Sequence, residues 1–189
     1  MATPRLDQLP DIEHAVWREL DAAVHRHEPP HAWRVGVLAT RDGEGVDARS
    51  VVLREFDAAA RTLLIYTDAR SPKAHQLGVH AQGVLVLWSA ALGWQLRLRL
   101  ALELQTDGLG VASRWARLKL TPAAQDYLSP MPPGSTLDHP AAALAPERQS
   151  REHFAVIAAQ VQSVDWLELD ARGHRRAVFE GGLRRWVSP

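Results

Sequence analysis

The segment WQLRLRLALELQ, residues 94–105, constrains the fold of this chain more than any other stretch. Apolar residues occupy every second position and, with the exception of Ala101, the positions between them are polar. Because successive side chains of a strand point to opposite faces of a sheet, this period of two predicts an antiparallel β-strand with one buried face. The side chains expected on that face are Trp94, Leu96, Leu98, Leu100, Leu102 and Leu104.

Further strands are predicted where short apolar runs lie between turn-forming residues. They cover residues 33–40, 47–56, 61–68, 83–90, 161–169, 174–180 and 183–187. The run GVLVLWSA at 83–90 shows little alternation, so we expect both of its faces to be buried. With few helices between these strands, the pattern favours a mainly β fold built as an antiparallel barrel.

Helices are predicted at the N-terminus and between some of the strands. Residues 11–27 place apolar side chains four residues apart and end before two prolines, which is typical of an amphipathic helix. Shorter helices are expected at 71–80, 110–119, 121–128 and 147–160, and a proline-rich loop at 129–146. No internal repeat or linker divides the chain, so we predict one domain over residues 1–189.

Composition argues against several classes of protein. Lysine and arginine together number 22, as do aspartate and glutamate, and a formal net charge of zero disfavours a nucleic-acid-binding protein. The chain has no cysteine, and its nine histidines show no metal-binding spacing, so we predict no metal site. We find no signal region and no run of about 20 apolar residues, and we expect a cytoplasmic protein without membrane contact.

Two cations and a hydroxyl lie near predicted strand and helix ends between residues 48 and 77. Arg49 begins a strand, and Lys73 lies in the first turn of a helix that Ser71 is placed to cap. A phosphate is bound well by a guanidinium, an ammonium and the free amides of a helix N-terminus. Taken alone, the spacing of these charges favours ordinary surface residues over a phosphate site.

The order of residues in this region resembles that of the pyridoxamine 5′-phosphate oxidase-like, FMN-binding split-barrel family. The family pattern is Arg-x-Val-x-Leu-(Lys/Arg), then Tyr-Thr, then Ser-x-Lys-Ala-x-Gln-(Leu/Ile). In this chain it appears as Arg49-Ser-Val-Val-Leu-Arg54, Tyr66-Thr67 and Ser71-Pro-Lys73-Ala-His-Gln-Leu77. The resemblance covers about residues 31–108 well and about residues 155–189 loosely, and several matched positions make it more specific than one motif.

This resemblance implies a homodimer of six- to eight-stranded split barrels, with FMN in a groove at the subunit interface. Arg49 and Lys73 would bind the FMN phosphate, and Ser71 would assist them. Tyr66 and Thr67 would lie along the ribityl chain or the phosphate, although Tyr66 is equally suited to the core.

The resemblance also assigns residues to the flavin ring. Val51, Val52 and Leu53 would flank the ring, in a run that begins with Ser50 and ends with Arg54. Arg54 stands where the oxidases carry a lysine, which keeps the charge and changes its geometry.

Three further positions are expected near the flavin. Gln95 would hydrogen-bond the polar edge of the ring, with Arg97 as a weaker candidate. Arg176 is the expected C-terminal flavin residue, with Arg175 as the alternative. Leu167 falls where the oxidases place a tryptophan against the flavin.

The substrate region departs most from the oxidases. Their substrate phosphate is held by a Tyr, an Arg and a Ser on a helix, and the segment GVASRWARLKL at 110–120 has no clean match to this set. Arg114 or Arg117 could substitute in part. We therefore predict poor oxidation of pyridoxine and pyridoxamine 5′-phosphate.

The function implied is that of an FMN-dependent oxidoreductase acting on a small molecule, with no side chain identified as a catalytic acid or base. Two alternatives remain on the same fold. One is a non-catalytic carrier or sensor that binds flavin or haem, and the other is a deazaflavin-dependent reductase.

Overall fold

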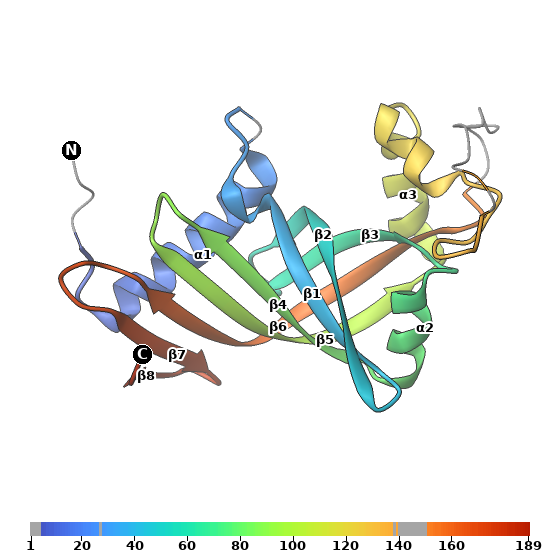
Figure 1. The fold of residues 1–189 in the computed structure, drawn as a ribbon. Helices are drawn as coiled ribbons and strands as arrows, with labels where there is room; N and C mark the ends of the chain where they lie inside the picture. Colours follow the sequence, from blue (N-terminus) through green and yellow to red (C-terminus); the bar gives the residue numbers. More distant parts are fainter. Residues whose placement is uncertain (1–4, 27, 138, 140–150) are drawn as a thin grey trace.

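The structure is a computed structural model that describes residues 5–26, 28–137, 139 and 151–189 (Figure 1). Its helices are α1 (Leu9–His25), η1 (Ala32–Arg34), α2 (Pro72–Val79), α3 (Gly108–Leu118) and η2 (Pro122–Tyr127), where η marks a 3-10 helix. Its strands are β1 (Val35–Asp42), β2 (Gly45–Asp57), β3 (Thr62–Asp68), β4 (Gln82–Ser89), β5 (Trp94–Gln105), β6 (Phe154–Glu168), β7 (Arg175–Glu180) and β8 (Leu183–Val187). His27, most of the proline-rich segment after residue 137, and residues 147–150 of the predicted fourth short helix lie outside the described residues.

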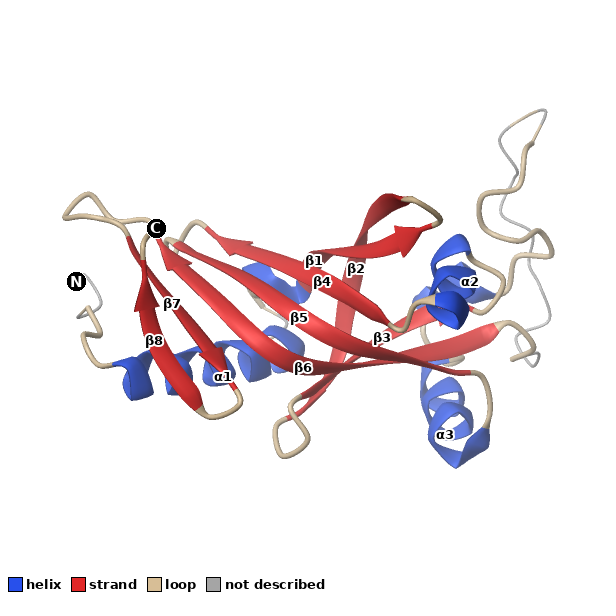
Figure 2. Cartoon of the chain, turned by 90° about the horizontal axis from the view of Figure 1, so that it is seen from below, coloured by secondary structure: helices blue, strands red, loops and turns tan. Residues whose placement is uncertain are grey.

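Six antiparallel strands close into a barrel in the order β3-β2-β1-β4-β5-β6, and pairing of β3 with β6 completes it. The long strand β6 pairs with β5 along one edge and with two strands along the other, where residues 154–160 pair with β3 and residues 163–168 pair with β7. Beyond this point β7 and β8 extend the sheet away from the barrel (Figure 2). The predicted antiparallel split barrel is therefore confirmed.

The inward-facing side chains of the strands form the main core, and α1 and α2 lie at opposite ends of the barrel (Figure 1). The alternation predicted for β5 is confirmed, since Leu96 and Leu98 are fully buried while Arg97 and Arg99 are exposed. Each fully buried leucine contributes about 1.5–3 kcal/mol relative to an exposed one.

A second, smaller core forms outside the barrel, where α3 and η2 pack on the outer face of β3 and β6. Phe154 is at its centre, with ring centroids 5.2 Å from Tyr66, 5.4 Å from Trp115 and 5.4 Å from Tyr127. This core attaches the segment that follows β5 to the barrel.

The helix predicted at 147–160 is wrong for its second half, because residues 154–160 begin β6. The alanines of this run favour a helix, but its side chains alternate between two cores. Ile157 and Ala159 face the barrel, and Phe154 and Val156 face the second core. An apolar run buried on both faces cannot be assigned to helix or strand from its period alone.

The prediction that 83–90 is buried on both faces is also wrong for the single chain. Leu85 and Leu87 of β4 point into the barrel, whereas Trp88 is 46% exposed. The neighbouring strand β1 carries Val35, 51% exposed, and Val37, 43% exposed, on the same outer side. We call this apolar area, made of Val35, Val37, Val84, Val86 and Trp88, the β1–β4 outer surface.

Candidate cofactor site

Arg49 lies at the end of the barrel that α2 covers, and its guanidinium joins β1, β2 and α2. It donates from Nη2 to Oε1 of Gln76 at 2.9 Å and from Nη1 to the hydroxyl of Thr40 at 2.5 Å. The carboxylate of Asp47 accepts a further bond from Nη2 of Arg49 and one from the amide of Gln76 at 3.1 Å. Three polar side chains, those of Thr40, Asp47 and Gln76, therefore hold Arg49 in one orientation.

Lys73 projects from the first turn of α2 into the same area. Burial lowers the pKa of Lys73, and the positive charge of Arg49 lowers it further, against opposing effects of Asp68 and Asp47. Among the described residues Lys73 has no ion-pair partner. Two cations that share a partly buried place destabilise each other, and an anion bound between them would relieve this.

Hydroxyl groups line the start of α2 beside Lys73. Ser71 is the N-cap residue, and its Oγ lies 3.2 Å from Oγ1 of Thr67 without capping the helix amides. Arg70 pairs with the buried carboxylate of Asp68 at 2.7 Å and also donates to the backbone of residues 129 and 130. The structure thus brings together four of the predicted phosphate-side residues: Arg49, Thr67, Ser71 and Lys73.

The run predicted to flank the flavin ring divides between two faces of β2. Val51 and Leu53 are buried in the barrel core, whereas Ser50 and Val52 face outward. Only the backbone of Val51 and Leu53 is left for a flavin on the outer face. The β2–β3 pairing shifts its register between Leu53 and Glu55, so Arg54 does not follow this alternation.

Arg54 and Tyr66 meet on the outer side of the barrel, at the edge of the second core. The guanidinium carbon of Arg54 lies 5.8 Å from the ring centroid of Tyr66, and its buried Nε has no hydrogen-bond partner among the residues that the structure describes. Tyr66 donates from its hydroxyl to Glu55 at 2.7 Å. Burial, together with the hydrogen bond to Glu55, raises the pKa of Tyr66 to about 12, so this phenol stays a donor.

Gln95 and Arg176 lie on the outer face of the other half of the sheet. The strand register aligns Gln95 with Leu167 and Leu167 with Arg176. Arg176 donates to both oxygens of Asp165 at 2.9 and 2.8 Å, and Arg97 pairs with the same carboxylate. On β6, Leu167 faces outward between Gln95 and Arg176, whereas the neighbouring Trp166 is fully buried in the core.

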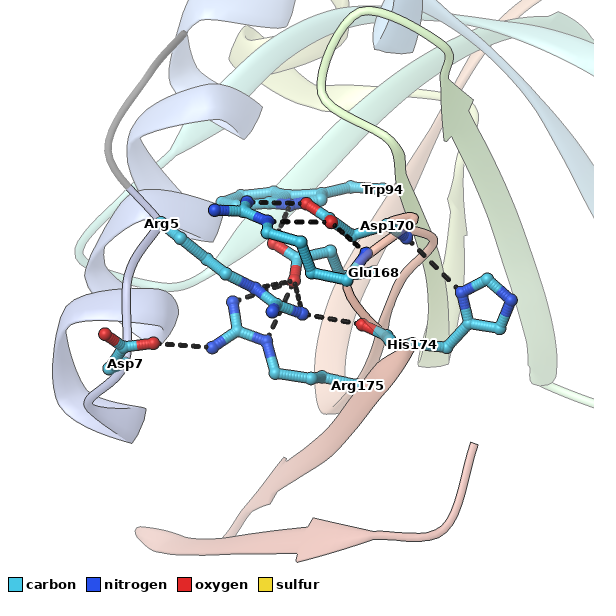
Figure 3. A network of polar contacts seen from close by, with 9 residues as sticks. Arg5, Asp7, Trp94, Glu168, Asp170, His174 and Arg175 are labelled. Carbon is cyan, nitrogen blue, oxygen red and sulfur yellow. Dashed lines mark hydrogen bonds and ion pairs between the residues drawn. The ribbon is translucent and has the colours of Figure 1, made fainter.

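Arg175 belongs to a different network on the other side of β7 (Figure 3). Its Nε donates to Oε2 of Glu168 at 2.8 Å, as does Nε of Arg5, and Trp94 donates to Oε1 at 3.4 Å. A further bond of 3.0 Å joins Arg175 to Asp7. Because Arg175 ties the N-terminal segment to the sheet, the geometry favours Arg176 as the residue facing outward with Gln95.

The predicted residues therefore form two groups that do not meet within one chain. Lys73 is in α2 and Arg49 lies beside this helix, whereas Arg176 is on β7, and α2 and β7 are at opposite ends of the molecule (Figures 1 and 2). Between β2 and β5 the sheet places β1 and β4.

An open groove of about 940 Å³ on the outer face of the barrel was not predicted from the sequence. The groove runs over β3, β5 and β6 beside α3 and has small apolar residues such as Ala101 and Ala158 on its floor. Glu55, Glu103 and Arg114 contribute charged side chains. Among the residues that the structure describes, no group of three His, Asp or Glu side chains is placed to hold a metal ion. Within the same residues, no helix combines the length and apolarity needed to cross a bilayer.

Residues 14–105 match the protein family described as pyridoxamine 5′-phosphate oxidase, FMN-binding domain. A relative from Caulobacter vibrioides, named pyridoxine/pyridoxamine 5′-phosphate oxidase, is 26% identical over 186 residues, which cover 92% of this chain and 80% of the relative. A relative of the same name from Azorhizobium caulinodans is 27% identical over 155 residues, which cover 76% of this chain and 71% of the relative.

Solved structures show the same fold across the whole chain. A pyridoxamine 5′-phosphate oxidase-related, FMN-binding protein from Nostoc punctiforme superposes with a TM-score of 0.74 at 21% identity, covering 99% of this chain and 100% of its own. PhzG from Burkholderia lata, solved with tetrahydrophenazine-1-carboxylic acid, gives a TM-score of 0.73 at 16% identity and covers 100% and 98%. At these identities the likeness establishes the fold.

Proposed function

Because residues 14–105 belong to the pyridoxamine 5′-phosphate oxidase FMN-binding domain family, in which the cofactor is FMN, we propose that this protein is an FMN-dependent oxidoreductase acting on a small molecule. The observation that carries the proposal is Lys73 in the first turn of α2, which lies near Arg49 of β2, has no ion-pair partner among the described residues and would be neutralised by an FMN phosphate. We place the protein in the cytoplasm as one domain over residues 1–189.

Each group of residues has a part in holding FMN. Arg49 and Lys73 would bind the phosphate by charge-assisted hydrogen bonds, with the hydroxyls of Ser71 and Thr67 beside them. Ser50, Val52 and Arg54 face outward from β2 and would lie nearest the ring. FMN supplies hydride acceptance and donation, while the protein binds and orients the reactants.

We propose that a second copy of the chain completes the site. Gln95 and Arg176 lie at the opposite end of the molecule from Lys73, so in a two-fold dimer they would reach the FMN held by the partner. The β1–β4 outer surface, with Trp88 46% exposed, is an apolar area suited to burial in such a dimer.

The dimer is tested by light scattering of Trp88→Glu. A charge on the β1–β4 outer surface should give a monomer and weaken FMN binding by at least about tenfold, since the contacts from Gln95 and Arg176 of the second copy would be lost. Leu109→Glu, at a residue 90% exposed on α3, is the matched control and should stay dimeric. A monomeric wild-type protein that holds FMN at micromolar concentration would refute the shared site.

The phosphate assignment is tested by titrating the protein with FMN and with riboflavin. Charge-assisted hydrogen bonds contribute about 1.5–3 kcal/mol each, so FMN should bind more than about tenfold more tightly. Equal affinities would remove the phosphate site. Repeated reduction of the bound flavin by NADH or NADPH, followed by reoxidation over many cycles, would distinguish an enzyme from a carrier that holds the flavin unreactive.

A further inference from the structure

Glu55 collects donors from three elements on the outer side of the barrel. Tyr66 of β3 donates to Oε1 at 2.7 Å, and Arg114 of α3 reaches Oε2 with Nη2 at 2.9 Å. One turn further along α3, Arg117 donates to Oε1 at 3.2 Å. We call Tyr66, Arg114 and Arg117, with Arg54 beside Tyr66, the outer cation cluster.

The outer cation cluster has the composition of an anion-binding site. Guanidinium groups and a phenol hydroxyl are the donors that recognise phosphate and carboxylate, and arginine does so through paired N–H groups. Here the anion is the chain's own carboxylate, contacted by Nε and Nη2 of Arg114. Within the described part of the chain, the buried Nε of Arg54 has no hydrogen-bond partner.

Glu55 stays ionised in this setting. Burial opposes ionisation, but the hydrogen bonds from Tyr66 and Arg114 and the charges of Arg114 and Arg117 lower the pKa of Glu55 below its ordinary value. A ligand anion would have to displace a carboxylate that already holds the best donors.

The cluster is accessible and adjoins the residues assigned to FMN. Glu55 and Arg114 line the groove of about 940 Å³, and the side chain of Glu55 is 33% exposed. Arg54, which the family resemblance places beside the flavin, precedes Glu55 in β2, and Tyr66 contacts both. A substrate at the flavin would therefore approach this cluster.

We infer that Glu55 determines substrate specificity, because its carboxylate occupies the outer cation cluster and excludes substrates that carry a phosphate or similar anion there. The inference rests on the proposed function, since it concerns the substrate of the same site. It assigns the protein to unphosphorylated small molecules. Removing the charge of Glu55 would free Arg114, Arg117 and Tyr66 for an external anion.

The first experiment measures binding of inorganic phosphate to the FMN-loaded protein by calorimetry. The bound cofactor occupies the cations beside α2, so that added phosphate cannot bind there. Glu55→Gln should bind phosphate at least about tenfold more tightly than the wild type, from the contacts released. Glu103 lines the same groove, and its carboxylate forms no ion pair among the described residues. Glu103→Gln is therefore the control and should bind phosphate as the wild type does. The double variant Glu55→Gln/Arg114→Gln should lose the increase in phosphate affinity.

A second measurement uses the wild type alone and decides the question if Glu55→Gln fails to fold. Pyridoxamine and pyridoxamine 5′-phosphate should bind the FMN-loaded protein within about threefold of each other, since Glu55 denies the phosphate its donors. A preference of tenfold or more for the phosphorylated compound, or no gain of phosphate binding in folded Glu55→Gln, would overturn the inference. Failure of the protein to take up FMN would refute the proposed function instead. The role of Glu55 would then still be tested by comparing phosphate binding to Glu55→Gln and to Glu103→Gln, both in a Lys73→Gln background that removes the cation at α2.

Discussion

The two cationic regions of this barrel differ in what balances their charge. Beside α2, Lys73 shares a partly buried place with Arg49 and has no ion-pair partner among the described residues. Outside β2, Arg114 and Arg117 converge on Glu55, an acid of the same chain. Arg49 of the first region also holds a carboxylate, that of Asp47, so the contrast rests on Lys73, whereas both Arg114 and Arg117 of the second region are paired.

This difference shows how binding sites can be told from structural clusters of similar composition. A buried cation left beside another cation costs free energy in the empty protein and recovers it when an anion binds. A cation that already has an internal carboxylate gains little from an external one, because the ligand must compete with a tethered partner. Arginine count alone would rank the two regions in the wrong order.

The comparison predicts its largest effect for Lys73→Gln. Loss of the ammonium should weaken FMN binding by about 10- to 100-fold and leave riboflavin binding unchanged, because only the phosphate contact is removed. The chain's other lysine supplies the control, and Lys119→Gln should bind FMN as the wild type does. Fluorescence titration of both flavins gives the answer, and an equal loss of riboflavin affinity would mean that Lys73 supports the fold rather than the phosphate.

A smaller effect is expected from pH. Since the pKa of Lys73 lies below the usual 10.5 in the FMN-free protein, the ammonium loses its proton earlier on raising the pH. FMN affinity should fall several-fold between about pH 7.5 and about pH 10, whereas Lys73→Arg should hold its affinity over that range. The stability of the FMN-free protein has the opposite sign: the unfolded chain keeps this proton longer, so Lys73 makes the folded state more stable as pH rises through this window. FMN titrations at both pH values, with riboflavin as reference, check the prediction, and parallel curves for wild type and Lys73→Arg would contradict it.

The smallest effect is expected for Glu55→Gln on FMN binding itself. If the outer cation cluster contacts the substrate and not the cofactor phosphate, FMN affinity should change by less than about threefold. Because Glu55 is one-third exposed, loss of its ion pairs should lower the free energy of unfolding by only about 0.5–1 kcal/mol after solvent screening. Thermal melts and FMN titration measure both quantities. A tenfold loss of FMN affinity would mean that both regions belong to one cofactor site.

Much of the candidate site could be predicted because its residues lie in one continuous motif. Arg49, Ser71 and Lys73 fall within 25 residues, and the strand–helix order between them brings them to one end of the barrel. The role of Glu55 could not be predicted. Arg114 and Arg117 are three apart on a helix and so share a face, but their carboxylate partner is 59 residues away from Arg114 along the chain.

What the sequence by itself determined are the features set by local period and local chemistry. The alternation at 94–105, the strands before and after it, and the Ser-Pro start of α2 all follow from which side chains must leave water and which residues begin a helix. Only the tertiary structure decided which faces are covered. Residues 154–160 form a strand because two cores bury both of its sides, while β4 keeps Trp88 exposed because none of the described elements packs on it. Burial depends on partners distant in the sequence, and composition and period cannot identify those partners.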